Sequence, residues 1–177
     1  MGELFVRLNQ VWDALFGKLS KEDMAWVKSS LTCEEYSLFL RLSRPDQYHS
    51  FKVAKTAISL CLKDETEQLE LSIVKKAALL HDIGKADQRL LLLERILPVV
   101  TSIISLSLAK YIIEKSNING IARGFYVYAY HGSRGQQLAL IHSIDHQIIE
   151  VIAKHQQEVN KHDSKLLRLI KIADSRH

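Results

Sequence analysis

The stretch Ala78-Leu79-Leu80-His81-Asp82-Ile83-Gly84-Lys85 places a histidine and an aspartate side by side at the end of an apolar run. Burying an imidazole and a carboxylate without a partner is costly. A divalent metal ion would satisfy both groups at once. Taken alone, His81 and Asp82 would be explained equally well as a structural pair within the core. The rest of the chain is needed to choose between these interpretations.

Further side chains that can bind a metal occur at wide intervals on both sides of this pair. His49 lies upstream, and His131, His155 and Asp174 lie downstream. Imidazole nitrogen and carboxylate oxygen suit iron, manganese, zinc or nickel, and the lack of thiolates in the series argues against a structural zinc site. Because each interval is long enough for one helix to end and another to return, we expect the series to converge inside a helical bundle. Asp82 is the natural candidate for a carboxylate that bridges two ions.

Helical periodicity runs through nearly the whole chain. Apolar residues recur at three- and four-residue steps over residues 4–16, and capping boxes begin at Ser20 and Thr32. Ser43, with Pro45 in the first turn, opens another helix. Only 7 glycines and 2 prolines interrupt the chain. The sequence therefore predicts an all-α fold, a single-domain helical bundle with the metal site in its core.

Local signals also predict where the later helices begin and end. Asp64 or Thr66 would cap the helix that ends at the His-Asp pair, with Gly84 as its left-handed cap. A long helix would follow, with a kink near Pro98. Residues 125–130 are the one patch that is ambiguous between helix and strand. The helices expected in this half of the chain cover residues 90–115, 133–142, 145–157 and 164–175.

Length and charge restrict the function classes. A chain of 177 residues suits one compact domain, in which helices of residues 1–42 pack on a domain of residues 43–177. The net charge of +4 suits an anionic small molecule, and without a block of Lys and Arg we expect no nucleic-acid partner. Charges interrupt the apolar residues 90–113, so we expect a buried helix or a homodimer contact there and no membrane span. The start of the chain shows no signal peptide, which favours a cytoplasmic location.

Several short motifs resemble those of the HD-domain metal-dependent phosphohydrolases, and the resemblance covers about residues 44–174. The segments that carry it are Tyr48-His49-Ser50, Leu79-Leu80-His81-Asp82-Ile83-Gly84-Lys85 and Ile172-Ala173-Asp174. His131-Gly132 and His155 resemble the two extra histidines of the subgroup that holds two metals. Within that subgroup, the order and spacing are most similar to the bacterial symmetrical diadenosine tetraphosphate hydrolases, which are di-iron enzymes.

The resemblance implies a role for each of these residues. One metal ion would be bound by His49, His81, Asp82 and Asp174, and Asp82 would bridge to a second ion held by His131 and His155. Iron is the implied metal, with manganese, zinc or nickel as alternatives. The implied activity is hydrolysis of a phosphoester or phosphoanhydride, in a nucleotide, by attack of a metal-bound hydroxide. Asp82, Lys85 and Asp174 would be the catalytic residues, with Lys85 facing a substrate phosphate.

Some residues near these motifs have two interpretations. Arg134 is a second candidate for contact with the substrate phosphate, although a solvated arginine is an equal interpretation. His142 and His146 have a spacing that can bind metal on one helix, but a helix start between them places them on different elements. The aromatic residues within 125–130 are able to stack on a base, and core packing is the favoured interpretation.

Two rival functions remain open. A degenerate HD module would bind a nucleotide or a protein partner without turnover and would use the apolar residues 90–113 as its docking surface. The intact series of six ligands argues against this. A di-iron oxygenase on the same helical frame is the other rival, and Lys85 favours hydrolysis over it because a cation beside the metal site benefits phosphate chemistry.

Overall fold

Helices form the framework of the protein, and the described residues contain no strand. The computed structural model describes residues 17–63, 69–120 and 122–177. In chain order the elements are α2 (Lys21–Ser30), α3 (Cys33–Leu40), α4 (Arg44–Cys61), α5 (Leu71–Leu80), the 3₁₀ turn η1 (Ile83–Lys85), α6 (Leu92–Ile104), α7 (Leu106–Lys115), α8 (Arg123–Ile141), α9 (His146–Lys154) and α10 (Lys165–Asp174). The predicted all-α, single-domain fold is confirmed.

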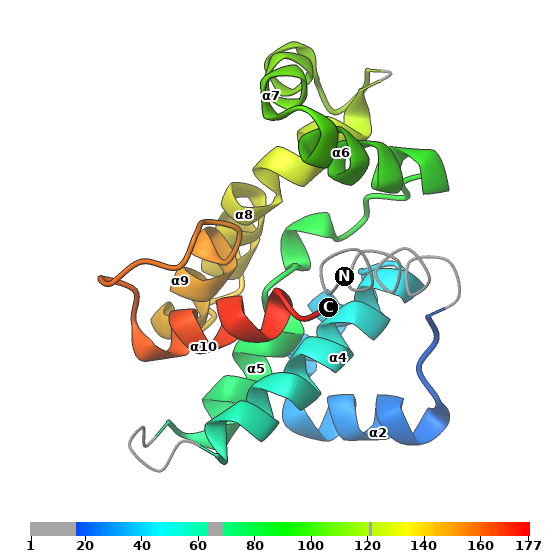
Figure 1. The fold of residues 1–177 in the computed structure, drawn as a ribbon. Helices are drawn as coiled ribbons and strands as arrows, with labels where there is room; N and C mark the ends of the chain where they lie inside the picture. Colours follow the sequence, from blue (N-terminus) through cyan, green and yellow to red (C-terminus); the bar gives the residue numbers. More distant parts are fainter. Residues whose placement is uncertain (1–16, 64–68, 121) are drawn as a thin grey trace.

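The core forms around α4 and α5, which pack side by side. Figure 1 shows α10 crossing this pair, and α9 also packs on α5. Their inward faces contribute fully buried side chains such as Val53, Leu79, Ile152 and Leu167. From the predicted N-terminal segment, α2 and α3 pack against α5. The helix predicted over residues 4–16 lies outside the described residues.

Three of the predicted helix starts in the first half of the chain are confirmed. Ser20 and Thr32 each form a capping box, in which the side-chain oxygen accepts a hydrogen bond from the backbone N–H three residues on. Ser43 caps α4 in the same way, with a proline in the first turn. The predicted caps Asp64 and Thr66 lie outside the described residues, but their prediction is wrong for α5, because this helix begins at Leu71 with Glu70 as its N-cap.

The long helix predicted before α8 is divided at a different place from the one expected. The chain breaks at Ser105, whose φ of −154° is extended and whose Oγ accepts a hydrogen bond from the Leu108 N–H. Pro98 lies inside α6 and does not end it. A proline has no N–H for the carbonyl four residues earlier, here that of Glu94. Gly124 of α8 packs directly against this carbonyl, since a Cβ at Gly124 would lie 2.0 Å from the oxygen.

Gly84, close to the His-Asp pair, is needed for close packing and not for a left-handed helix cap. The predicted left-handed cap at Gly84 is wrong, because no described glycine has a positive φ and the left-handed residue in this region is Asp87, with a φ of 62°. Gly84 lies in η1, where a Cβ would lie only 1.7 Å from the His131 carbonyl oxygen.

The start predicted for α8 is also wrong, because the helix begins at Arg123 and includes the ambiguous residues 125–130.

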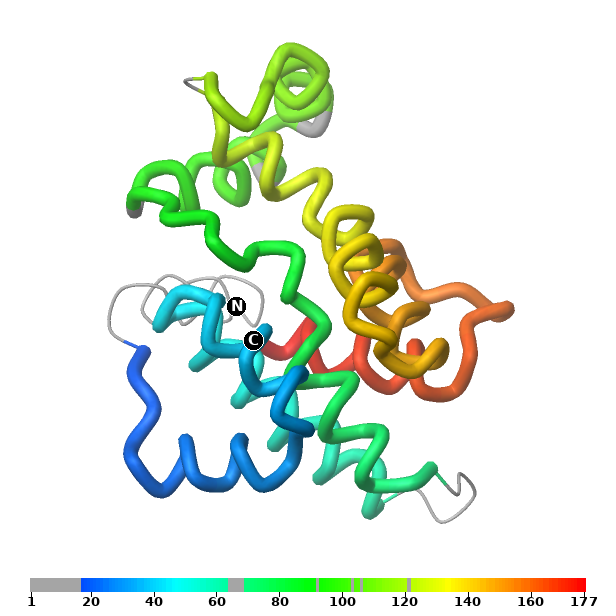
Figure 2. Tube along the Cα trace, turned by 180° about the vertical axis from the view of Figure 1, so that it is seen from behind, coloured from blue at the N-terminus to red at the C-terminus, as the bar shows by residue number. Residues whose placement is uncertain are grey.

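The metal-competent residues are drawn together by the path of the chain after α5. Seen from behind in Figure 2, the chain leaves α5, runs through η1 alongside α8 and reaches α6 and α7 at the far end of the molecule. It returns along α8, so η1 lies against the middle of that helix.

Within the described part of the chain, none of the helices has the length and apolarity that crossing a bilayer requires.

Candidate metal centre

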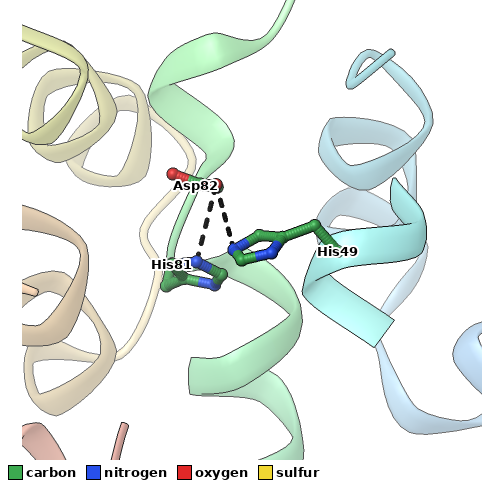
Figure 3. Close-up of side chains that lie close together, drawn as sticks. All are labelled: His49, His81 and Asp82. Carbon is green, nitrogen blue, oxygen red and sulfur yellow. Dashed lines mark ion pairs between the residues drawn. The ribbon is translucent and has the colours of Figure 1, made fainter. Parts of the chain in front are cut away.

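The six predicted ligands come from separate elements and converge on one region. Four of them are buried: His81, Asp82, His131 and His155. Their positions are His49 in α4, His81 at the C-cap of α5, Asp82 immediately before η1, His131 in α8, His155 at the C-cap of α9 and Asp174 as the last residue of α10. In Figure 3, the rings of His49 and His81 both face the carboxylate of Asp82.

One group of donors surrounds Oδ2 of Asp82. The Nε2 atoms of His81 and His49 lie 3.5 Å and 3.8 Å from this oxygen. Asp174 approaches the same two rings, with its Oδ1 3.0 Å from Nε2 of His49 and 3.7 Å from Nε2 of His81. We call His49, His81, Asp82 and Asp174 the first donor group.

A second group surrounds the other oxygen of the same carboxylate. Oδ1 of Asp82 lies 3.0 Å from Nε2 of His131 and 3.5 Å from Nε2 of His155. The two Nε2 atoms are 3.2 Å apart. We call Asp82, His131 and His155 the second donor group. Because the two groups share one carboxylate, the prediction that Asp82 lies between two sites agrees with the geometry.

Backbone carbonyls orient three of the imidazoles. Nδ1 of His81 lies 2.8 Å from the carbonyl oxygen of residue 78, Nδ1 of His131 lies 3.0 Å from that of residue 128, and Nδ1 of His155 lies 3.0 Å from that of residue 152. A carbonyl only accepts hydrogen bonds, so each Nδ1 carries the proton and donates it. Each Nε2 therefore directs a lone pair into the centre. This outer support is typical of histidines that bind metal.

The arrangement fits metal ions. Nε2 of His81 and Oδ1 of Asp82 are buried and have no hydrogen-bond partner there. The facing lone pairs of His131 and His155 repel each other unless a cation lies between them. Two nitrogens bound to one ion at about 2.1 Å, at angles of about 100°, would stand about 3.2 Å apart. The donors of each group, apart from Asp174 in the first, also lie within 4.8 Å of one another.

Burial and neighbouring charges set the protonation of these groups. Burial lowers the pKa of His81 to about 4, and burial with the nearby Lys85 charge lowers the pKa of His131. Burial alone would raise the pKa of Asp82, but the Lys85 ammonium and the surrounding histidines together outweigh it and hold that pKa well below its usual value. His49 differs, because burial lowers its pKa but the hydrogen bond with Asp174 and the charges of Asp174 and Asp82 together raise it. His81 and His131 are thus held in the neutral form and Asp82 in the ionised form, which are the forms that bind metal.

Lys85 lies directly beside the donors. Its Nζ donates a hydrogen bond to Oδ2 of Asp82 over 2.7 Å. Burial would lower the pKa of Lys85, but the carboxylates of Asp82 and Asp46 raise it above its usual value. The ammonium therefore stays charged. It faces a cavity of about 660 Å³ that is also lined by His49, Asp82, His131, His155 and Asp174.

Two further cations that the sequence analysis did not select line the same cavity. Arg95 of α6 forms an ion pair with Asp46 over 2.8 Å and donates a second hydrogen bond to Ser43. Lys171 of α10 is buried and donates to Asp163 over 2.8 Å. Arg95 has a local signal, since a charge inside an apolar helix needs a partner. Nothing local to Lys171 indicates that it faces the cavity, apart from its position one turn before Asp174.

Arg134 has a different environment from the one expected of a phosphate ligand. Its guanidinium donates hydrogen bonds to the carbonyl oxygens of Gly84 and Ala86, over 2.6 Å and 2.8 Å. It lines a smaller cavity and not the one that contains Lys85. Arg134 was predicted to contact the substrate phosphate. The structure corrects this prediction, because the guanidinium holds η1 against α8.

The remaining histidines and aromatic residues also have defined places. His142 caps the end of α8 and His146 begins α9, as predicted, and neither joins the donor groups. Of the aromatic residues, Phe125 is buried, whereas Tyr128 and Tyr130 are exposed. Core packing was therefore the wrong interpretation for these two tyrosines.

One of three comparisons with known proteins found a match to the chain. A search of curated proteins and a search of solved structures each found no match to the chain. The family model of the HD domain matches residues 47–177, a range that contains both donor groups. This match covers most of the chain, which therefore belongs to the HD domain family, typical of metal-dependent phosphohydrolases.

Proposed function

We propose that this protein is a phosphohydrolase that holds two divalent metal ions. The observation that carries the proposal is the pair of buried, unpartnered atoms, Nε2 of His81 and Oδ1 of Asp82, within a ring of inward lone pairs. The first donor group would hold one ion and the second donor group the other. Iron is proposed from the resemblance of the sequence, with manganese, zinc and nickel as alternatives.

Each part of the centre has a separate chemical task. Divalent ions polarise phosphoryl oxygens and lower the pKa of water. Asp82 would keep the two ions at a constant separation, because its carboxylate contacts both donor groups. Lys85 stays protonated and would offset the charge that accumulates on a phosphate toward the transition state. Asp174 remains ionised because His49 lowers its pKa against the effect of burial, so it can accept a hydrogen bond from the attacking water.

A nucleotide phosphoester or phosphoanhydride is the proposed substrate. The cavity of about 660 Å³ is within the range of small-molecule sites. Lys85, which stays charged beside the donors, suits a phosphate compound in this cavity. Diadenosine tetraphosphate belongs among the compounds to test because of the resemblance in order and spacing. The size and polarity of the cavity support a small molecule and not a nucleic acid.

A binding module without turnover is the second candidate. The observation that favours it is the exposed apolar face of α6, where Leu93 is 67% and Ile104 is 78% exposed. The same face would serve a homodimer. The cytoplasmic location and the homodimer both remain predictions.

Metal analysis combined with a phosphate-release screen tests the proposal. The full chain is loaded in turn with manganese, iron, cobalt, nickel or zinc, and released phosphate is measured over a set of nucleotides that includes diadenosine tetraphosphate. We expect about two ions per chain and phosphate release with at least one metal. Asp82→Ala should lose both ions and all activity, whereas His142→Ala, the matched control, should keep both.

Two results would contradict parts of this account. Full metal content in Asp82→Ala would exclude the bridging role of the carboxylate. Nucleotide binding without phosphate release under every metal would favour the binding module.

A further inference from the structure

A second cavity of about 320 Å³ lies along α8, outside the cationic one. Val127 and His131 of this helix line it, and His131 also lines the larger cavity. The other lining residues on this helix are Tyr126, Tyr130, Ser133, Arg134 and Gln137. They recur at helical spacing and therefore share one face of α8. Tyr128, which lines the larger cavity, belongs to another face. Gly84 of η1 and Ile118, from the connection before α8, complete the walls.

An aromatic pair forms one side of this cavity. The rings of Tyr126 and Tyr130 are one helical turn apart, with centroids 4.8 Å apart and planes inclined by 43°. Tyr130 is 44% exposed. The separation leaves no room for another ring between the two. A planar ligand would instead stack on an open face of the pair and cover apolar surface that now contacts water.

The polar groups of the cavity favour a neutral ligand. Nη1 of Arg134 donates to the carbonyls of both Gly84 and Ala86, so this nitrogen is not available to a phosphate. Gln137 is exposed at the rim, and its amide offers a donor beside an acceptor. An amide of this kind pairs with two atoms on the edge of adenine. The volume is near the lower limit for small-molecule sites, which suits a single nucleoside and not a dinucleotide.

We propose that this cavity is a binding site for a purine nucleoside, with the base stacked on the Tyr126–Tyr130 pair and its edge paired with Gln137. The site adjoins the candidate metal centre, because His131 lines both cavities, but its occupancy does not depend on the proposed hydrolase activity. A base bound there would lie against Gly84, in the same turn that carries Lys85.

Calorimetric titration of the full chain with adenosine tests this site. Adenosine has no phosphate, so it lacks the group that the metal centre would bind. We expect saturable binding that Tyr130→Ala and Gln137→Ala each weaken by about 5-fold or more, the lower end of the effect of removing a base-stacking or base-pairing side chain. Tyr130→Phe keeps the ring and should keep the affinity. Tyr111→Ala, which removes a tyrosine that is 60% exposed on α7, is the matched control and should bind like the unchanged chain.

Three outcomes would overturn the proposal. The first is no saturable binding of adenosine by the unchanged chain. The second is an equal loss in Tyr130→Ala and Tyr111→Ala. The third is a loss in Asp82→Ala but not in Tyr130→Ala, which would place the nucleoside in the metal cavity. Because phosphate release is measured separately, failure of the hydrolase proposal and failure of this one are distinguishable.

Discussion

Gly84→Ala should damage the metal centre through backbone contact alone. The added Cβ would lie 1.7 Å from the carbonyl oxygen of His131, 2.6 Å from its carbonyl carbon and 2.8 Å from the backbone nitrogen of Gly135. These are backbone atoms of one helix, which cannot rotate away as a side chain does. To restore ordinary contact, η1 and α8 must separate by roughly 2 Å.

That separation acts directly on the second donor group. Asp82 precedes η1 and His131 lies in α8, so the 3.0 Å between their facing atoms must lengthen. We expect a loss of about 1–3 kcal/mol in the free energy of unfolding, the usual cost of overpacking. We also expect the metal content to fall from two ions to one, because the first donor group does not include α8.

Urea denaturation and elemental analysis of the folded variant measure the two effects. Gly120→Ala is the matched control, because its nearest neighbour is the flexible side chain of Asn117 at 3.0 Å, which can move aside. Two ions per chain together with unchanged stability in Gly84→Ala would refute the reasoning. Equal damage in both variants would show that the effect is general to glycine replacement and not to this contact.

Three further predictions concern the donors and their protonation. His131→Ala should lose one of the two ions and stay folded, as elemental analysis and circular dichroism would show; loss of both ions would mean that the sites are not separable. Lys85→Met should keep both ions while kcat falls by about 100-fold or more, as expected when a charge beside a reacting phosphate is removed; an unchanged kcat would exclude the phosphate contact. Burial opposes protonation of His49, but its hydrogen bond with Asp174 raises its pKa above 6.5, so in the metal-free protein a proton competes for Nε2. Metal affinity should therefore rise with pH through the pKa of His49. His81, with a pKa of about 4, would already be neutral and would not contribute to this rise. Chelator competition across the neutral range measures the affinity, and an affinity that does not change with pH would contradict the prediction.

Local signals in the sequence were enough for the helical framework and for the donor series. The capping boxes at Ser20 and Thr32 depend on residues three positions apart, so neighbouring letters identify them. The donors were found because histidine and aspartate at the ends of apolar runs are costly to bury. The family resemblance rested on the same residues, and the match over residues 47–177 agrees with it.

The predictions that the structure corrected were made from residue types that have more than one structural use. Gly84 was read as a left-handed helix cap, but it allows close approach between η1 and α8, which are distant in the sequence. One helix was expected over residues 90–115, yet the chain forms two, with the break at Ser105, where a hydroxyl caps the second helix. Arg134 was read as a phosphate ligand because its backbone partners on η1 cannot be seen from its neighbours in the chain.

The amino-acid sequence by itself determined that this chain is helical and that six scattered side chains are able to bind metal. Those properties depend on residue type and on spacing within a few turns. Only the tertiary structure decided that Asp82 stands between two donor groups, that three imidazoles are oriented by carbonyls, and that Arg95 and Lys171 face the same cavity as Lys85. Such relations depend on how distant helices pack, and packing is a property of the whole core and not of any short segment.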